Sequence, residues 1–584
     1  MKKKILLLCN LSFTCLFLSS CSIMSFWDDT TEGKTKLVFF GWGNSAEVSL
    51  TEEFVDEFNA SQDEIYVEYT PIASDSYATK IRNALSRSNV PDVIIAGDGE
   101  IKPWIEMDGL CELDEFIENS TVFDLDDFWN EGQNRYYYNK NIRMNYSDSI
   151  KDEFKDDFHY YGIMRDLSPS VLFYNVQALE KVGINIISIP IDKIDEYNEK
   201  HNTHYEKVGY KEYETCIDES LKKTKNYDNT KDVYRVFNNQ IPLTWEWDDS
   251  LEEMDGSKGG KGELMELAKI LTKTSSYTLP STRYGIFYNN WFSLGWSVGA
   301  NSLQFIEDES EYIGGHYEFS LGDTNKNYKV KEGESFTINN HTYNENELVR
   351  YQDLKSVSES TDLKEKCYEL PSSLEATQFY VDLSSKWGYS PKPDFTASTS
   401  QYSLFSSGNS VAMTLDTRYS VGIWRKSIKK SGQSGGFDWD CAPAPVYKYG
   451  IKSGHSGSLA YCIPKKSKNK EAAFKFIEYI NGEEGQTAFA KEGYTIPNTK
   501  TLSNSDAFLV KGAKPYNSEI FIDAASYQRV GDWGFLPDKD WISIWAIEFN
   551  SKVLSGQTTL LESINRTKDR TQQKIDEYYK GINK

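Results

Sequence analysis

Short apolar runs alternate with amphipathic stretches over residues 36–95, and this alternation constrains the fold more than any other feature of the sequence. The predicted strands are 36–40, 65–69 and 91–95, and the predicted helices between them are 49–58 and 77–85. Ser49 and Glu52 form a capping box at the start of the first of these helices. A strand–helix–strand–helix–strand order is typical of an α/β fold in which helices flank a mostly parallel sheet.

The chain is too long for one hydrophobic core. At 584 residues it is expected to form at least two domains. Near the C-terminal end, 470–480 is a predicted helix, and 540–579 is predicted to form two helices broken at Ser555-Gly556. Three polar stretches interrupt the regular parts and are interpreted as insertions. They are 133–159, 189–241 and 302–373.

The N-terminus has the features of an export signal. Lys2 to Lys4 form a positive region, and the apolar stretch that follows, Ile5 to Leu18, is too short to span a bilayer comfortably. Leu18-Ser19-Ser20-Cys21 then resembles a bacterial lipobox, in which the cysteine receives a lipid and becomes the new N-terminus. We therefore expect 1–20 to be removed, Cys21 to be lipidated and 21–34 to act as a tether on the extracellular face of the cell membrane. An ordinary signal peptide or membrane anchor is the alternative.

Charge and composition narrow the class of ligand. The formal net charge is −24, with no basic stripe, which argues against a nucleic-acid partner. The 38 Tyr, 30 Phe and 14 Trp supply more flat apolar surface than a typical core needs, and sugar rings are one use for it. The five cysteines after residue 21 have irregular spacing, so we expect neither a disulfide framework nor a zinc site, and no cofactor. Pairing of Cys441 with Cys462 stays open.

Several sequence blocks, in this order, resemble a known family. The blocks are Leu37-Val-Phe-Phe-Gly-Trp-Gly43, Val90-Pro-Asp-Val-Ile-Ile-Ala96, Tyr161-Gly-Ile-Met-Arg165, Leu172-Phe-Tyr-Asn175, Ser410-Val-Ala-Met413 and Ile463-Pro-Lys-Lys-Ser467. Together they resemble the extracellular solute-binding proteins of ABC sugar importers, of the maltose-binding-protein type. The three insertions and residues 506–540 depart from the family pattern.

The resemblance implies a two-lobe, type II periplasmic-binding-protein-like α/β fold, each lobe a sheet flanked by helices, with the ligand in the cleft between the lobes. The chain would cross between lobes near 165–171, 455 and 505. The N-terminal lobe would be 35–168 with 456–505, and the C-terminal lobe 169–455 with 506–584. A monomer that captures a sugar, closes about its hinge and delivers the sugar to a permease is the implied function, without catalysis.

Candidate ligand-binding residues follow from where strands end. In open α/β sheets, ligands bind beyond the carboxyl ends of strands. In the first lobe this singles out Trp42, Asn44, Glu47 and Asp98, with an aromatic face for the sugar and amide or carboxylate groups for its hydroxyls. A packed Trp42 and a turn role for Asp98 are the alternatives.

In the second lobe, the resemblance points to Tyr419 as a stacking residue, flanked by Asp416 and Arg418, which could instead form a surface ion pair. His455 lies at a crossover of small residues. Trp541 and Trp545 share one face of a late helix, and we expect one to face the ligand and one the core.

Residues 289–301 contain two further tryptophans. Read as a helix capped by asparagine, the stretch places Trp296 on the face of Phe292, towards a core. Asn290 and Trp291 fall elsewhere and are candidates for the cleft.

Two rival functions belong to other classes. A surface-tethered glycoside hydrolase would need two carboxylates at a set separation, and 88 acidic residues neither support nor exclude that. A metal or phosphate-ester binder of the same architecture is the other alternative. No metal-ligand spacing and no nucleophile or phosphate-loop motif stands out.

Overall fold

The structure is a computed structural model. It describes residues 33–146, 150–214, 220–223, 227–228, 233–248, 259–273, 280–289, 292–354, 361–396, 399–537, 539–580 and 582. The predicted export segment with Cys21, and the candidates Asn290 and Trp291, lie outside these residues. Among the described residues, no helix combines the length and the apolar character needed to cross a membrane.

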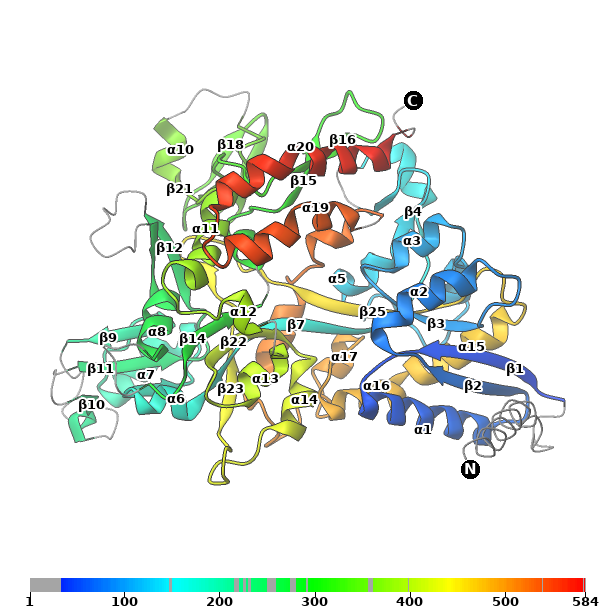
Figure 1. The fold of residues 1–584 in the computed structure, drawn as a ribbon, viewed down its shortest axis with the longest axis horizontal. Helices are drawn as coiled ribbons and strands as arrows, with labels where there is room; N and C mark the ends of the chain where they lie inside the picture. Colours follow the sequence, from blue (N-terminus) through cyan, green and yellow to red (C-terminus); the bar gives the residue numbers. More distant parts are fainter. Residues whose placement is uncertain are drawn as a thin grey trace, which may run out of the picture.

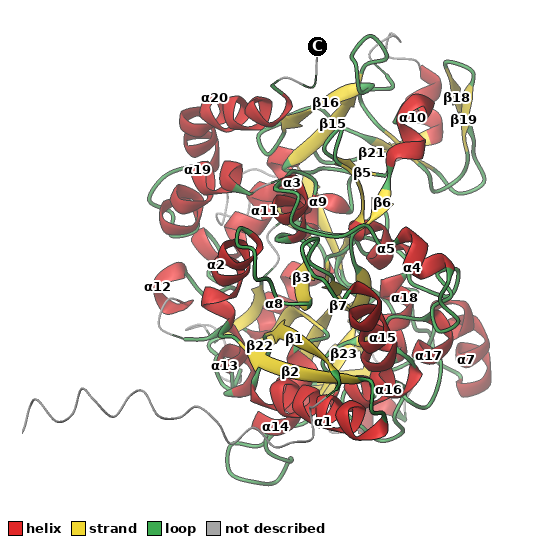
Figure 2. Ribbon diagram, turned by 90° about the vertical axis from the view of Figure 1, so that its right-hand side faces the viewer, coloured by secondary structure: helices red, strands yellow, loops and turns green. Residues whose placement is uncertain are grey.

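One mixed sheet runs through the middle of the molecule (Figure 1). Its strand order is β14 (Tyr284–Tyr288), β22 (Val411–Thr417), β7 (Ile163–Asn175), β25 (Ser456–Cys462), β3 (Val93–Gly97), β1 (Thr35–Gly41) and β2 (Ile65–Pro71). Two further strands, β23 (Trp439–Ala442) and β26 (Ile496–Pro497), also pair with β7. The predicted two-lobe α/β class is confirmed, with helices on the outside of the strands (Figure 2).

Strand β7 joins the two ends of this sheet. All 13 of its residues are buried. Its first half pairs with β25, and its second half pairs with β22 and β23. The crossing predicted near 165–171 falls within this strand, and the one near 455 falls at the start of β25. The lobe boundaries themselves remain a prediction.

The predicted strands of the first lobe all form, as β1, β2 and β3. The first helix, α1 (Ser45–Ser61), begins four residues before the predicted start at Ser49. Its capping box is formed by Asn44 and Glu47, because the Asn44 side chain accepts from the Glu47 amide and the Glu47 carboxylate accepts from the Asn44 amide. The prediction of a capping box at Ser49 was wrong for this reason.

Aromatic rings hold the helices of the first lobe onto its sheet. Helices α15 (Lys470–Asn481) and α16 (Glu483–Glu492) return from late in the chain to pack against α1 and β1. The ring centroid of Phe476 lies 5.2 Å from that of Phe58 and 5.6 Å from that of Phe39. Helix α2 (Ser74–Leu85) lies in the connection between β2 and β3.

The second lobe has its own core around α8 (Glu263–Leu271), α11 (Ser373–Ser385), β14 and β22. Smaller sheets extend from it. Strands β9 (Tyr210–Tyr213) and β11 (Val233–Asn238) continue from β8 (Ile184–Ile187), and β15 (Leu303–Glu307) pairs with β16 (Gly315–Phe319). Cys441 and Cys462 are free, buried thiols on different strands.

A third core joins two of the three stretches predicted to be insertions to the end of the chain. It contains residues from 142–158, from 303–321, and from α19 (Asp540–Glu548) and α20 (Leu560–Tyr579). Polar contacts reinforce it, since Arg143 Nη1 donates to the Tyr578 carbonyl (2.6 Å) and Lys151 Nζ donates to the Glu311 carbonyl (2.7 Å). The break between the two last helices, predicted at Ser555-Gly556, lies between α19 and α20.

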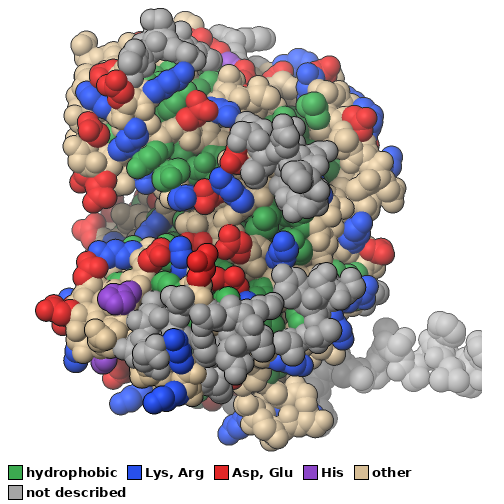
Figure 3. All heavy atoms as spheres, turned by 90° about the vertical axis from the view of Figure 1, so that its left-hand side faces the viewer, with side chains coloured by type: hydrophobic (Ala, Val, Ile, Leu, Met, Phe, Trp, Pro, Cys, Tyr) green, Lys and Arg blue, Asp and Glu red, His purple; other side chains and the backbone are tan. Residues whose placement is uncertain are grey.

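Charged side chains cover much of the exterior. Acidic and basic groups are interspersed on the face shown in Figure 3, with smaller apolar areas between them. Such a surface keeps an acidic protein in solution but singles out no binding partner.

Trp545 tests the third core. It is 2% exposed, and its ring contacts those of Phe319 and Phe549, with centroids 5.9 and 5.6 Å away. We expect Trp545→Ala to lower the free energy of unfolding by about 3–5 kcal/mol through lost burial and the cavity that remains. Urea denaturation measures this. Ile547→Ala, on the same helix at 72% exposure, is the matched control and should change stability by less than about 0.5 kcal/mol. Equal effects of the two variants would contradict the assignment.

Candidate ligand-binding site

A cavity lies where β1, β3 and β22 end, alongside β7 and β25. Its volume is about 700 Å³, within the range of small-molecule sites. Its walls are Trp42, Gly43, Asn44, Ser74, Tyr77, Ala78, Gly97, Asp98, Glu100 and Trp104 from the N-terminal end of the chain, Arg165, Asp166 and Ser168 from β7, Tyr402, Thr417, Tyr419 and Ile423 around β22, and His455, Gly457, Ser458, Leu459 and Thr495. We call it the interlobe cavity.

Aromatic rings face the cavity from both lobes. Trp42, Tyr77 and Trp104 form a chain of neighbouring rings with centroid separations of 6.4 and 6.5 Å. Tyr77 is fixed because its hydroxyl donates to the Phe40 carbonyl and accepts from the Ile95 amide, both at 2.9 Å. On the other side, Tyr402 and Tyr419 are 6.4 Å apart. Rings on opposite walls can sandwich a flat apolar ligand face.

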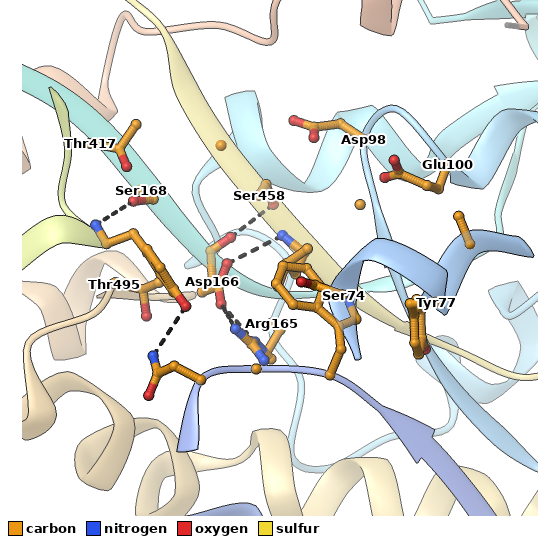
Figure 4. Close-up of a pocket in the computed structure, with 18 of the residues that line it drawn as sticks. Ser74, Tyr77, Asp98, Glu100, Arg165, Asp166, Ser168, Thr417, Ser458 and Thr495 are labelled. Atoms are coloured by element: carbon orange, nitrogen blue, oxygen red, sulfur yellow. Dashed lines mark hydrogen bonds and ion pairs between the residues drawn. The ribbon is translucent and has the colours of Figure 1, made fainter. Parts of the chain in front are cut away.

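A buried ion pair on β7 lies between these walls (Figure 4). Arg165 Nε and Nη2 both approach Asp166 Oδ2 at 2.6 Å, and the two residues are 5% and 4% exposed. The other Asp166 oxygen accepts from the Leu459 amide (3.2 Å). The pair is held in place by backbone contacts as well as by charge, so it offers polar atoms to a ligand at fixed positions.

Asp98 also has an arginine partner. Arg135 Nη1 lies 2.7 Å from Asp98 Oδ2, and the same guanidinium donates to the Ser456 carbonyl and hydroxyl, both at 2.6 Å. Burial raises the pKa of Asp98, and Arg135 opposes that shift. Asp98 is therefore tied to the start of β25 and not merely a turn residue in Gly-Asp-Gly.

Tyr419 closes one edge of the cavity. Its hydroxyl donates to Glu47 Oε2 (2.8 Å) and accepts from Asn44 Nδ2 (3.1 Å). Burial, and then the Glu47 charge, raise the pKa of Tyr419, so the hydroxyl keeps its proton at neutral pH. This contact connects the start of α1 with the end of β22.

Four of the predicted site residues do not line the cavity: Asp416, Arg418, Trp541 and Trp545. Asp416 is 3% exposed and caps the Thr417 amide, with burial raising its pKa to about 6. Arg418 is fully buried, with its guanidinium 4.6 and 4.9 Å from the ring centroids of Phe508 and Phe521. Because both residues are buried, neither forms the expected surface ion pair.

Trp541 and Trp545 also lie outside the candidate site. Both belong to the third core, at 0% and 2% exposure, and neither lines the interlobe cavity. The expectation that one of them faces the ligand was wrong, because the rings of both lie beside Phe319, from the stretch 302–373, in the third core. Trp296 is buried as predicted, at 3% exposure.

The structure brings together six of the predicted residues: Trp42, Asn44, Glu47, Asp98, Tyr419 and His455. Glu47 reaches the site through Tyr419 and Asn44. Sequence reasoning missed Arg165, Asp166, Tyr402, Ser458 and Thr495. A signal was available for two of them, since Arg165-Asp166 is a charged pair within the mainly apolar stretch 161–174. Within the described ranges, no group of three or more metal-ligating side chains converges.

Comparison with known proteins gives a consistent result. Two family models match, both described as bacterial extracellular solute-binding protein, at residues 42–199 and 329–513. No protein of curated function matches the chain in sequence.

Solved structures match over most of the chain. An ABC substrate-binding protein from Listeria monocytogenes in complex with cycloalternan has a TM-score of 0.58 at 16% identity, covering 93% of this chain and 99% of that one. A solute-binding protein from Thermotoga lettingae bound with α-D-tagatose has a TM-score of 0.55 at 16% identity, covering 93% and 100%. The sugar-binding protein MalE from Xanthomonas citri has a TM-score of 0.53 at 14% identity, covering 93% and 98%. At these identities the likeness shows the fold.

His455 gives the cavity a pH signature. Burial, together with Arg135 and Arg529, lowers its pKa to about 3, whereas an unfolded histidine titrates near 6.5. Between these values the unfolded chain binds one more proton than the native chain, so stability falls as the pH falls through this window. We expect wild-type protein to lose about 1–2 kcal/mol more than His455→Gln between pH 7 and pH 5. Urea unfolding at both pH values measures this, and an identical pH dependence in the two proteins would contradict it.

Proposed function

This chain belongs to the bacterial extracellular solute-binding proteins, and on that premise we propose that it captures a sugar, specifically an oligosaccharide, for an ABC importer. The proposal includes a lipid anchor on Cys21 at the extracellular face of the membrane and delivery of the sugar to a permease. It treats the chain as a monomeric binding protein that does not turn its ligand over.

The interlobe cavity is the observation that carries the proposal. Aromatic rings stand on two of its walls, and its buried charges are already paired, Arg165 with Asp166 and Arg135 with Asp98. An ion would gain little from charges that are neutralised, whereas a polyhydroxyl ligand can use the remaining lone pairs and the flat rings. The sugars named for the similar structures, cycloalternan and α-D-tagatose, fit the same chemistry.

We propose ligand contacts for the five predicted residues that line the cavity and for Asp166. Trp42 and Tyr419 would stack on sugar rings, and Asn44, Asp98, His455 and Asp166 would bond hydroxyls. Glu47 would act through Tyr419, which it holds by a hydrogen bond.

Hinge closure is the proposed mechanism. The Tyr419–Glu47 hydrogen bond already crosses the edge of the cavity, and a sugar touching both walls would add contacts that exist only in the closed form. A hydrolytic role finds no support in the carboxylates, since Asp98 and Asp166 are each held by an arginine.

A ligand panel tests the proposal. We expect maltotriose, maltotetraose or another glycan to raise the melting temperature and quench tryptophan fluorescence through Trp42. At 100 times its Kd, a ligand adds about 2.7 kcal/mol of stability. Differential scanning fluorimetry with glycans, D-tagatose, ferric citrate and glucose 6-phosphate makes the measurement. If only ferric citrate or glucose 6-phosphate raises the melting temperature, the ligand belongs to the metal or phosphate-ester class and the sugar proposal fails.

Gly457 allows the cavity to be blocked without damage to the fold. A Cβ placed on it meets no atom within 4 Å, and the residue lines the interlobe cavity. We expect Gly457→Leu to fill part of the cavity and weaken glycan binding at least tenfold, with Gly457→Ala intermediate and both unfolding midpoints unchanged. Isothermal titration measures the affinities. If Gly457→Leu binds the glycan with wild-type affinity, the glycan does not bind in this cavity.

A further inference from the structure

A second cavity, of about 390 Å³, lies beside the interlobe cavity. Its lining comes largely from stretches predicted to be insertions, with Met144 and Asn145 from 133–159 and Gln304, Phe305 and Tyr317 from 302–373. Residues 451–454, just before His455, complete one wall. The volume falls in the range of small-molecule sites.

The lining combines flat rings with amide groups. Trp296, Phe305, Tyr317 and Phe535 supply rings. Asn145, Asn301 and Gln304 supply side-chain amides, each of which can both donate and accept hydrogen bonds. This is a composition that suits the two surfaces of a sugar, its apolar ring face and its hydroxyl edge.

The charges around this cavity are balanced: Arg529 and Lys452 each have an acidic partner, and the lining also holds one further cation, Arg350, and one acid, Glu307. The Arg529 guanidinium lies 3.8 Å from the centroid of Trp296 and bonds Asn301 Oδ1 (2.6 Å) and Asp532 Oδ1 (3.0 Å). Lys452 is paired with Asp523 (2.9 Å). The occupant that these groups favour is therefore uncharged.

Two buried polar atoms on the lining have no hydrogen-bond partner. They are Trp296 Nε1 and Ser453 Oγ, in residues that are 3% and 8% exposed. A buried donor without a partner costs about 1–3 kcal/mol, so such atoms are uncommon. Both residues line the cavity, but the two atoms themselves are covered by protein, so the rings and amides are the groups that would contact a ligand.

An aromatic wall separates the two cavities. The ring of Phe292 lies 5.0 Å from that of Trp296, on the second cavity, and 5.4 Å from that of His455, on the interlobe cavity. Trp533 closes the same cluster, 4.8 Å from Phe292 and 5.4 Å from His455. Occupancy of one cavity therefore does not require occupancy of the other.

We propose that the second cavity is a separate site for a short, uncharged saccharide, built on the chain's own insertions. It goes beyond the interlobe site and does not depend on which ligand that site takes. Phe305 and Tyr317, with ring centroids 5.1 Å apart, would contact the sugar ring, and Asn301 and Gln304 would bond its hydroxyls.

The test uses the purified protein with the Gly457→Leu change, which blocks the interlobe cavity. Maltose, maltotriose, maltotetraose and D-tagatose are the probes, and saturation-transfer NMR with isothermal titration detects binding. We expect at least one probe to bind. Adding Phe305→Ala, or separately Gln304→Leu, should weaken that binding at least tenfold.

Tyr312→Ala is the matched control, because Tyr312 is a 46% exposed aromatic of the same stretch that does not line the cavity. It should leave the affinity unchanged. If no probe binds the Gly457→Leu protein, or if binding survives both Phe305→Ala and Gln304→Leu, the second site is overturned. A separate result would contradict the sugar proposal for the interlobe cavity. That result is glycan binding with the same affinity in wild type and in Gly457→Leu.

Discussion

The continuous burial of β7 is the constraint on which the rest of the structure depends. This strand pairs with β25 in its first half and with β22 and β23 in its second, so both lobes share one backbone ladder. The ends of β1, β3 and β22 are thereby brought to one place. Because the strand that joins the lobes also lines the interlobe cavity, through Arg165, Asp166 and Ser168, the cavity lies at the junction of the lobes.

Burial at that junction determines the electrostatics of the cavity. A buried charge left alone would be costly, and two buried arginines beside the cavity each have a neighbour of opposite sign: Arg165 with Asp166 and Arg135 with Asp98. Arg135 does more, because it also bonds Ser456 at the start of β25. The same pairing offsets the charges of Arg165 and Arg135, and the cavity also presents aromatic faces and hydrogen-bonding groups to a ligand.

Sequence reasoning succeeded where the signal is local. The apolar runs at β1, β2 and β3 predicted strands, and the rule that ligands lie beyond strand ends selected Trp42, Asn44 and Asp98, which line the interlobe cavity. It failed where long-range packing decides. Asp416 and Arg418 look exposed in a polar stretch, yet packing from Phe508 and Phe521, about 90 to 100 positions later, buries Arg418. Packing distant in sequence also buries Trp541 and Trp545 in the third core. Tyr402 could not be predicted, because it comes close to Tyr419 only in the folded chain.

The insertions change what hinge motion would require in this chain. Residues 142–158 share a core with α19 and α20, and Arg143 bonds the Tyr578 carbonyl while its guanidinium also pairs with Glu106 near the end of α3 (Ile101–Glu106). One stretch therefore contacts both the region after β3 and the end of the chain. When the interlobe cavity opens, this stretch must either move with one lobe and lose its bonds to the other lobe, or act as the hinge about which the lobes rotate. Because packed cores resist shear more than single polar contacts do, the ion pair between Arg143 and Glu106 is the contact expected to yield first. The third core, which includes residues of α19 and α20, would then move as a unit.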